Sequence, residues 1–213
     1  MIEKTLSNVR DYTVMNKKPK ISIAIPVYDM KNKDFFLKRC LDSIERQTFK
    51  DYEVVMTEEG KMAENTNAAM RKCHGDIIKI LYMDDYMAHD DALQEIADAW
   101  MDDTRWMVTG CSHDPGTHFH LPTYNDDIYK GVNTIGSPSV LSLKNDADLL
   151  FFDERLTWLL DCDLYKRLYE KWGPPTILND INATIGIHDG QTTMTLPDEI
   201  KEDEHDYLLT KHA

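Results

Sequence analysis

The chain has 213 residues and a formal net charge of −14 at pH 7, a length that allows one large α/β domain or two small ones. This charge argues against a broad interface with nucleic acid or an acidic membrane, because both are polyanions, although one nucleotide can still bind through a metal. No segment approaches the ~20 consecutive apolar residues of a membrane-spanning helix, so we expect a soluble protein with no membrane span.

The four cysteines are scattered and form no CxxC pair. This usage indicates reduced thiols, and we therefore expect a cytoplasmic protein. Residues 1–19 are mostly polar and predict an N-terminal arm that precedes the folded region.

The first half of the folded region, residues 20–110, alternates predicted strands and helices. Runs of β-branched and other apolar residues predict strands at 21–27, 52–56, 77–83 and 106–109. Apolar residues at helical spacing predict helices at 35–47, 65–73 and 90–101. This alternation implies right-handed crossovers and a mostly parallel, Rossmann-like sheet flanked by helices, which is an α/β fold.

The second half, residues 111–195, has a different pattern. Residues 112–129 are rich in His, Pro, Asp and Gly and predict a long loop. Predicted strands at 137–143, 176–178 and 183–188 accompany a predicted helix at 160–172. Residues 196–213 are polar and charged, and we expect either a loose tail or a docking segment.

Polar residues follow the first three predicted strands. Asp84 and Asp85 come directly after the third strand, Glu58 and Glu59 after the second, and Tyr28 after the first. The carboxyl ends of parallel strands meet at one edge of a sheet, where ligands bind in open α/β folds. Adjacent carboxylates repel each other, and a divalent cation with oxygen ligands relieves that repulsion. The alternative is a solvated acidic turn that leads into the next helix.

Two further residues are candidates for chemistry. Asp161 lies at the predicted start of helix 160–172, where it is either a general base or a helix N-cap, with Asp163 in the first turn. His188 at a strand end is either structural, a metal ligand or a hydrogen-bond donor to a phosphate.

The order and spacing of several motifs resemble the family 2 glycosyltransferases, which have the GT-A fold. In the first half these motifs are Pro26-Val27-Tyr28, Ser43–Thr48, Tyr52-Glu53 with Glu58-Glu59-Gly60-Lys61, Asn67 with Gly75-Asp76, and Met83-Asp84-Asp85. In the second half they are Asn133–Leu143, Phe152-Asp153-Glu154, Leu160-Asp161-Cys162-Asp163-Leu164 and Ile187–Thr192. The resemblance covers roughly residues 20–195 and departs from the family at Met83, at both glutamates and at Lys61.

The resemblance implies a single GT-A domain and inverting transfer of a sugar from a nucleotide diphosphate sugar, most simply a UDP-sugar. The acceptor is a saccharide or another hydroxyl compound, and the cofactor is Mn²⁺ or Mg²⁺. The implied donor contacts are Pro26, Tyr28, Glu58, Glu59, Asn67 and Asp84. The implied metal ligands are Asp85 and His188, and the implied general base is Asp161. Residues 20–110 then bind the donor, and residues 111–195 bind the acceptor.

Two rival functions remain open at this stage. A sugar-1-phosphate nucleotidyltransferase also uses a nucleotide, a metal and carboxylates at a sheet edge, but its early phosphate loop is rich in glycine, unlike YDMKNKD here. A nucleotide-sugar-binding module without turnover is compatible with Met83 and the two glutamates. The segment HDPGTHFH, residues 113–120, fits no common zinc pattern, and we expect a loop over the acceptor pocket.

Overall fold

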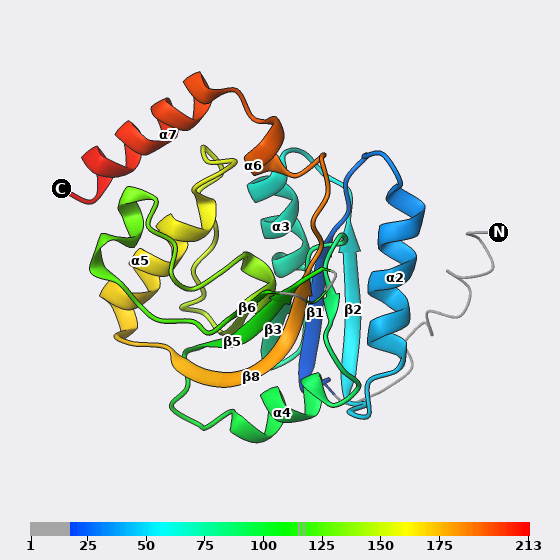
Figure 1. The fold of residues 1–213 in the computed structure, drawn as a ribbon. Coiled ribbons are helices and arrows are strands. Elements are labelled where there is room, and N and C mark those ends of the chain that lie inside the picture. Colours follow the sequence, from blue (N-terminus) through cyan, green and yellow to red (C-terminus); the bar gives the residue numbers. More distant parts are fainter. Residues whose placement is uncertain (1–17, 115, 117) are drawn as a thin grey trace.

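The structure is a computed structural model that describes residues 18–213 except residues 115 and 117. The predicted N-terminal arm, residues 1–19, therefore falls almost entirely outside the described residues. The described chain forms one α/β domain around an eight-stranded sheet, as the sequence predicts. Figure 1 shows the helices arranged around this sheet, with α2 and α7 on opposite sides.

The sheet has the strand order β2-β1-β3-β7-β5-β8-β4, with β6 paired to β5. Its strands are β1 (Ile21–Pro26), β2 (Tyr52–Thr57), β3 (Ile77–Ile80), β4 (Tyr86–Met87), β5 (Trp106–His113), β6 (His118–His120), β7 (Leu141–Lys144) and β8 (Thr176–Ile185). The helices are α2 (Lys33–Glu45), α3 (Met62–Arg71), α4 (Ala92–Ala99), α5 (Leu160–Trp172), α6 (Thr192–Thr195) and α7 (Asp198–Lys211), with 3-10 turns η2 (Asp126–Lys130) and η3 (Pro138–Val140).

Strand direction decides where the polar residues gather. Strand β1 is parallel to β2 and β3, while β7 is antiparallel to both β3 and β5, and β8 is parallel to β5. The strands β1, β2, β3, β5 and β8 therefore run in one direction, and the short β4, β6 and β7 run against them. The sheet is thus mixed in its pairing, but the carboxyl ends of its five co-directional strands share one edge.

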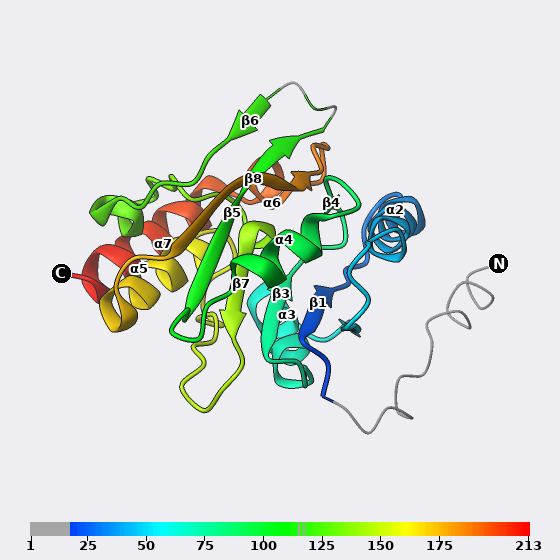
Figure 2. The same cartoon turned by 90° about the horizontal axis from the view of Figure 1, so that it is seen from below.

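The core occupies both faces of the sheet. In β1, Ile21, Ile23 and Ile25 face the layer formed by α2 and α4, and Ala24 faces the layer that contains α3 and α5. Side chains that alternate along a strand in this way bury both faces and explain the continuous apolar run ISIAI. Figure 2 shows α2 and α7 again on opposite sides, with the β5–β6 hairpin at the rim.

Two segments differ from the sequence predictions because of contacts distant in sequence. Two short strands were expected at 176–178 and 183–188, but β8 is continuous from 176 to 185 and has register shifts opposite Thr109, Gly110 and Cys111. A bulge accommodates the polar residues Asn179 and Asp180 without ending the strand. The expected loop at 112–129 contains the end of β5, strand β6 and the turn η2.

The C-terminal segment is not a loose tail. Residues 198–211 form helix α7, whose side chains Glu204 and Leu208 are buried. Its apolar pattern is weak, and the sequence therefore gave little sign of a helix. Polar contacts to residues 153–163 hold it in place, as described below.

Two observations bear on the expected cellular setting. All four cysteines are buried free thiols. Across the described residues, no helix combines the length and the apolar character needed to cross a membrane.

Candidate active site

The residues that follow the co-directional strands meet at their shared edge. Asp84 follows β3, Asp114 follows β5, and His188 follows β8. The Nε2 atom of His188 lies 2.9 Å from Oδ2 of Asp84. The guanidinium of Arg39, on α2, donates to the backbone oxygen of Asp84 at 2.6 Å and to the carboxylate of Asp114 at 2.5 Å. One arginine, which the sequence analysis did not single out, therefore joins two strand ends.

Asp84 and His188 form a partly exposed contact between a carboxylate and an imidazole at this edge. Their side chains are 21% and 14% exposed. The backbone N–H of Gly190 donates to Nδ1 of His188 at 3.1 Å. Because Nδ1 accepts this bond, a neutral imidazole carries its proton on Nε2. The Nε2–H group then donates a hydrogen bond to Asp84. His188 also packs against Phe36, with ring centroids 4.8 Å apart, so its position is well defined.

Asp85, one of the two predicted metal ligands, is held by a backbone contact, and its role as a ligand stays a prediction. Its side chain is buried, and its Oδ1 atom accepts a hydrogen bond from the backbone N–H of Gly186 at 2.8 Å. Burial, together with the charge of Asp84, raises the pKa of Asp85 to about 8. The backbone N–H of Asp85 donates to the Tyr82 carbonyl and closes a turn. Within this turn the Asp85 carboxylate faces the interior of the protein. Asp85 therefore ties the end of β3 to the end of β8.

A buried lysine lies behind Asp85. Lys79 on β3 is fully buried, and its Nζ donates to the Ser139 carbonyl in η3. Burial lowers the pKa of Lys79 to about 7, and the charge of Asp85 opposes that shift. The Ser139 hydroxyl in turn accepts from Tyr82 N–H at 2.9 Å. These contacts fix the strand exit that carries Asp84.

Pro26 at the end of β1 and Tyr28 in the loop after it lie next to this exit. Pro26 is the last residue of β1 and is in register with Thr57. The Tyr28 ring meets the Tyr82 ring edge to face, with centroids 6.3 Å apart. Its hydroxyl is buried near the Thr66 side chain, and burial raises the pKa of this phenol well above its usual range.

Glu58 and Glu59 lie at the end of β2, as the sequence predicts, but both are paired with lysines. Glu58 contacts Nζ of Lys33 and Glu59 contacts Nζ of Lys72, each at 2.5 Å. Both carboxylates are more than half exposed. Their contact with a donor nucleoside stays a prediction, and it requires them to exchange or share these partners.

Asn67, one of the predicted donor contacts, is bound to the 152–154 segment. Its side chain is 1% exposed, and its amide nitrogen donates to the Phe152 carbonyl and to Glu154, both at 2.9 Å. Its oxygen accepts from Phe152 N–H at 2.9 Å. Both ends of the carboxamide are thus occupied by the 152–154 segment, and its contact with a donor stays a prediction.

The neighbouring Asn65, which the sequence analysis missed, joins two of the loops at the site edge. Its amide nitrogen donates to the Val27 carbonyl at 2.8 Å, and its oxygen accepts from Glu59 N–H at 3.0 Å.

The motif at 43–48, at the end of α2, also joins segments that are distant in sequence. Gln47 binds the His89 carbonyl and Leu93 N–H, and thereby holds the segment that follows Asp84 and Asp85.

Asp161 lies in the first turn of α5. Its Oδ2 atom accepts from the side chain of Asn133 at 2.9 Å, and its Oδ1 atom accepts from Cys162 N–H at 2.7 Å. Burial raises the pKa of Asp161 to about 6, although both hydrogen bonds oppose the shift. The residue at the N-cap position is Leu159, so Asp161 does not have the alternative capping role. A carboxylate whose pKa lies near neutrality is suited to accept a proton.

Asp163 is fully buried and contacts two cationic side chains and an imidazole. It contacts Arg167 on its own helix at 2.7 Å, Lys211 at 2.6 Å and His212 at 2.9 Å. Its carboxylate is therefore neutralised within the protein and joins α5 to the end of α7.

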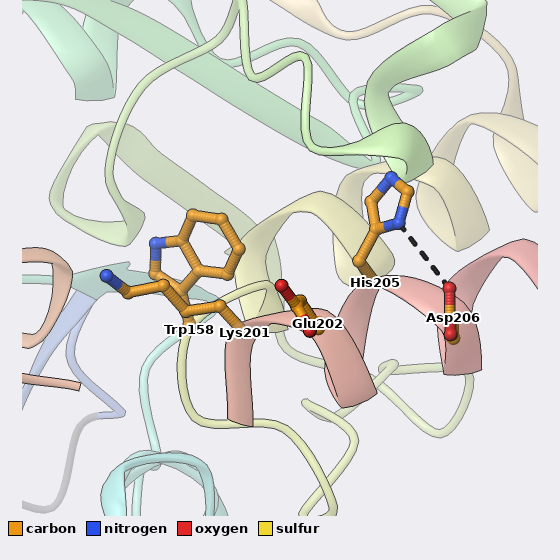
Figure 3. A pocket seen from close by; sticks show the side chains of 5 residues that line it. All are labelled: Trp158, Lys201, Glu202, His205 and Asp206. Atoms are coloured by element: carbon orange, nitrogen blue, oxygen red, sulfur yellow. Dashed lines mark ion pairs between the residues drawn. The ribbon is translucent and has the colours of Figure 1, made fainter. Parts of the chain in front are cut away.

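A cavity of about 420 Å³ lies beside the segment that leads into α5. It is lined by Trp158, Lys201, Glu202, His205 and Asp206. Figure 3 shows the indole of Trp158 with the Lys201 side chain beside it, and Glu202, His205 and Asp206 further along α7. An aromatic face opposed by charged groups is a common arrangement for binding polar ligands that also have an apolar face.

The metal-ligating residues of the described chain do not converge in larger groups. Nowhere in residues 18–213 outside 115 and 117 do three or more His, Cys, Asp or Glu side chains form a metal-binding group. His113, His118 and His120 lie in the β5–β6 hairpin, and Nε2 of His120 contacts the Thr134 carbonyl at 3.0 Å. Among the described residues, the Asp84–His188 pair would therefore offer a cation two side-chain ligands of these types.

Comparison with known proteins gives matches only at the level of structure. No family model and no curated protein matches the sequence. TarS from S. aureus, residues 1–349, superposes with a TM-score of 0.60 and 17% identity, over 78% of this chain and 60% of that one. The chain shares its fold with this structure. The same TarS fragment in complex with UDP-GlcNAc gives a TM-score of 0.62 and 15% identity, over 84% of this chain and 61% of that one.

A second structural relative comes from an archaeon. The mannosyltransferase PcManGT from Pyrobaculum calidifontis, in complex with GDP-Man and Mn²⁺, gives a TM-score of 0.57 and 14% identity. The match covers 81% of this chain and 57% of that one. At these identities the likeness establishes the fold, and the chain spans only about three fifths of these proteins.

Proposed function

We propose that this protein transfers a sugar from a nucleotide diphosphate sugar to an acceptor hydroxyl, with inversion at the anomeric carbon. The observation that carries the proposal is the Asp84–His188 pair at the shared edge of five co-directional strands. Structures with the same fold hold UDP-GlcNAc, or GDP-Man with Mn²⁺. We assign the donor to this edge, with Tyr28 and the end of β2 beside it.

The chemistry of Asp84 and His188 fits a divalent cation, Mn²⁺ or Mg²⁺. A carboxylate oxygen and an imidazole nitrogen are both accepted by Mn²⁺, and diphosphate oxygens of the donor supply further ligands. When bound, such a cation offsets the charge that develops on the leaving diphosphate. A cation held at Nε2 would require the imidazole proton on Nδ1, the atom that accepts from Gly190 N–H in this structure.

Asp161 is the proposed general base. The acceptor oxygen forms a bond to the anomeric carbon, the bond from that carbon to the diphosphate breaks, and the acceptor proton passes to the Asp161 carboxylate. The contacts from Asn133 and Cys162 N–H fix the orientation of that carboxylate before the acceptor arrives. Proton removal of this kind typically contributes about 10²–10⁴-fold to the rate.

The cavity beside Trp158 is the proposed binding site for the acceptor. Trp158, whose indole offers a face for a sugar ring, precedes Asp161 by three residues in the segment that leads into α5. Glu202, Asp206 and Lys201 offer hydrogen bonds to ring hydroxyls across the cavity.

A binding module without turnover is the second candidate, and one observation favours it. Met83, the first position of the expected acidic motif, is fully buried, and its sulfur accepts from Tyr28 N–H at 3.1 Å. It therefore belongs to the core and cannot replace an aspartate at the donor.

Turnover of the donor separates the two candidates. The protein is incubated with UDP-GlcNAc and, separately, with GDP-Man, in Mn²⁺ and in EDTA, and release of the free nucleotide is followed over hours. A transferase releases UDP or GDP slowly to water, and only with the cation. Tight, cation-dependent binding without any release supports the binding module, and absence of binding to both donors refutes the assignment of this edge.

A further inference from the structure

The C-terminal helix α7 inserts one carboxylate beneath the start of helix α5. Glu204 is 6% exposed, although glutamate is rarely buried. Its Oε1 atom accepts from Thr157 N–H at 2.7 Å, and its Oε2 atom accepts from Trp158 N–H and Leu159 N–H, both at 2.9 Å. A single side chain thus satisfies three consecutive backbone donors in the segment that leads into α5.

This contact lies at the entrance to helix α5. The residue at the N-cap of α5 is Leu159, which has no side-chain oxygen. The amide groups at a helix start carry partial positive charge and need acceptors, and a carboxylate is a strong acceptor. Glu204 accepts from the N–H of this N-cap residue and from the N–H groups of the two residues before it.

A second set of contacts holds the end of α7 against the same segment. Lys211 binds Asp153 at 2.7 Å and Asp163 at 2.6 Å, and the Tyr207 hydroxyl donates to Asp153 at 2.7 Å. These contacts lie on both sides of residues 157–159 in the sequence. The helix is therefore attached before, within and after the stretch that carries Trp158 and Asp161.

We infer that Glu204 is a positioning residue for the acceptor side of the site. It sets the direction in which Trp158 enters the cavity and the place at which α5 begins, and hence the position of Asp161. Glu204 lies on the buried side of α7, while Lys201, Glu202 and His205 line the cavity. The expected effect of Glu204 on the transfer rate rests on the proposed function. Its expected effect on the order of residues 157–163 does not.

The chemistry of the carboxylate makes the inference testable with an isosteric change. Glu204→Gln keeps the size of the side chain, but it replaces one acceptor oxygen by an NH₂ group that faces the same backbone donors. The matched control is Asp203→Asn, which removes one negative charge from the adjacent, exposed position of the same helix. Glu204→Asp keeps the charge with a shorter reach and serves as the milder variant.

Amide hydrogen exchange is the first measurement, because it does not depend on any activity. We expect faster exchange at residues 157–163 in Glu204→Gln, intermediate exchange in Glu204→Asp, and unchanged exchange in Asp203→Asn, while β1 and β3 stay protected in all three. Wild-type exchange at 157–163 in Glu204→Gln overturns the inference. If Glu204→Gln does not fold, the same comparison is decided by Glu204→Asp.

The second measurement is single-turnover transfer, together with titration of the nucleotide. We expect the transfer rate of Glu204→Gln to fall by roughly 10-fold or more, because small displacements of catalytic groups are costly, while nucleotide affinity stays within about twofold. Faster exchange at 157–163 with an unchanged rate overturns the positioning role. If the wild-type protein has no turnover, the proposed function fails, and the exchange experiment still decides whether Glu204 holds this segment.

Discussion

At the level of single residues, the donor side of the site depends on the contact between Asp84 and His188. Asp84→Asn removes the charge of the carboxylate with little change in its shape. We expect this variant to lose the Mn²⁺-dependent part of its affinity for UDP or GDP, because an amide is a weak ligand for a hard cation. Calorimetric titration in Mn²⁺ and in EDTA measures that part directly.

Asp85→Asn is the matched comparison, since the Asp85 side chain is buried against Gly186 N–H. We expect Asp85→Asn to keep most of the cation-dependent affinity. The opposite ranking of the two variants would restore Asp85 as the ligand and remove Asp84.

On the acceptor side, the residue that we expect to determine the pH dependence of transfer is Asp161. Burial raises the pKa of its carboxylate to about 6, and only the deprotonated form accepts a proton. The transfer rate of the wild-type protein should therefore rise with pH, reach half of its plateau near pH 6, and level off above it. A rate that is flat between pH 5 and pH 8 is incompatible with Asp161 as the titrating base.

Asp161→Asn provides the corresponding substitution. We expect transfer to fall by about 10²-fold or more and the pH dependence to disappear, while the affinity for nucleotide and cation stays nearly unchanged. Single-turnover kinetics and nucleotide titration of the same preparation separate the two effects. Loss of donor binding would place Asp161 in the donor site and leave the base unassigned.

At the level of secondary-structure elements, Asp163 joins α5 to α7. Its buried carboxylate contacts Arg167, Lys211 and the His212 imidazole. Asp163→Asn removes the buried anion that Arg167 and Lys211 share, and we expect the free energy of unfolding to fall by about 3 kcal/mol or more. Urea unfolding measures this change.

Asp42→Asn is the control for that substitution, because Asp42 forms an exposed pair with Lys38. Pairs of this kind contribute about 0–1 kcal/mol. Equal midpoints for the two variants would mean that α7 is not attached through Asp163.

At the level of the whole molecule, ligand binding should stabilise the folded state. A nucleotide diphosphate at 100-fold excess over its Kd adds about 2.7 kcal/mol of stability through mass action. We expect UDP or GDP to raise the melting temperature by several degrees in Mn²⁺ and by less in EDTA. A thermal-shift series of the common nucleotide diphosphates tests this, with the nucleoside monophosphates as controls, and a flat series in both conditions contradicts a nucleotide site.

Local patterns in the sequence determined the scaffold of this protein. The alternation of apolar runs and helical periodicity predicted the order of β1, α2, β2, α3, β3 and α4, and the bounds of α5 agree with the predicted 160–172. Local patterning is enough here because hydrophobic periodicity reports which side of an element is buried. The positions of Asp84 and Asp161, at a strand exit and a helix start, followed from the same reasoning.

Only the tertiary structure decided which side chains work together. Asp84 and Asp85 are adjacent in sequence, but a hydrogen bond from Gly186, 101 residues away, turns Asp85 inward and leaves Asp84 for His188. The carboxamide of Asn67 is occupied by Phe152 and Glu154, which a linear motif cannot reveal. In the sequence Glu204 belongs to a polar tail. In the structure its carboxylate accepts from three consecutive backbone N–H groups of the segment that precedes α5. Each of these roles depends on partners brought together by folding, because the direction of a side chain at the end of a strand or helix is set by contacts and not by periodicity.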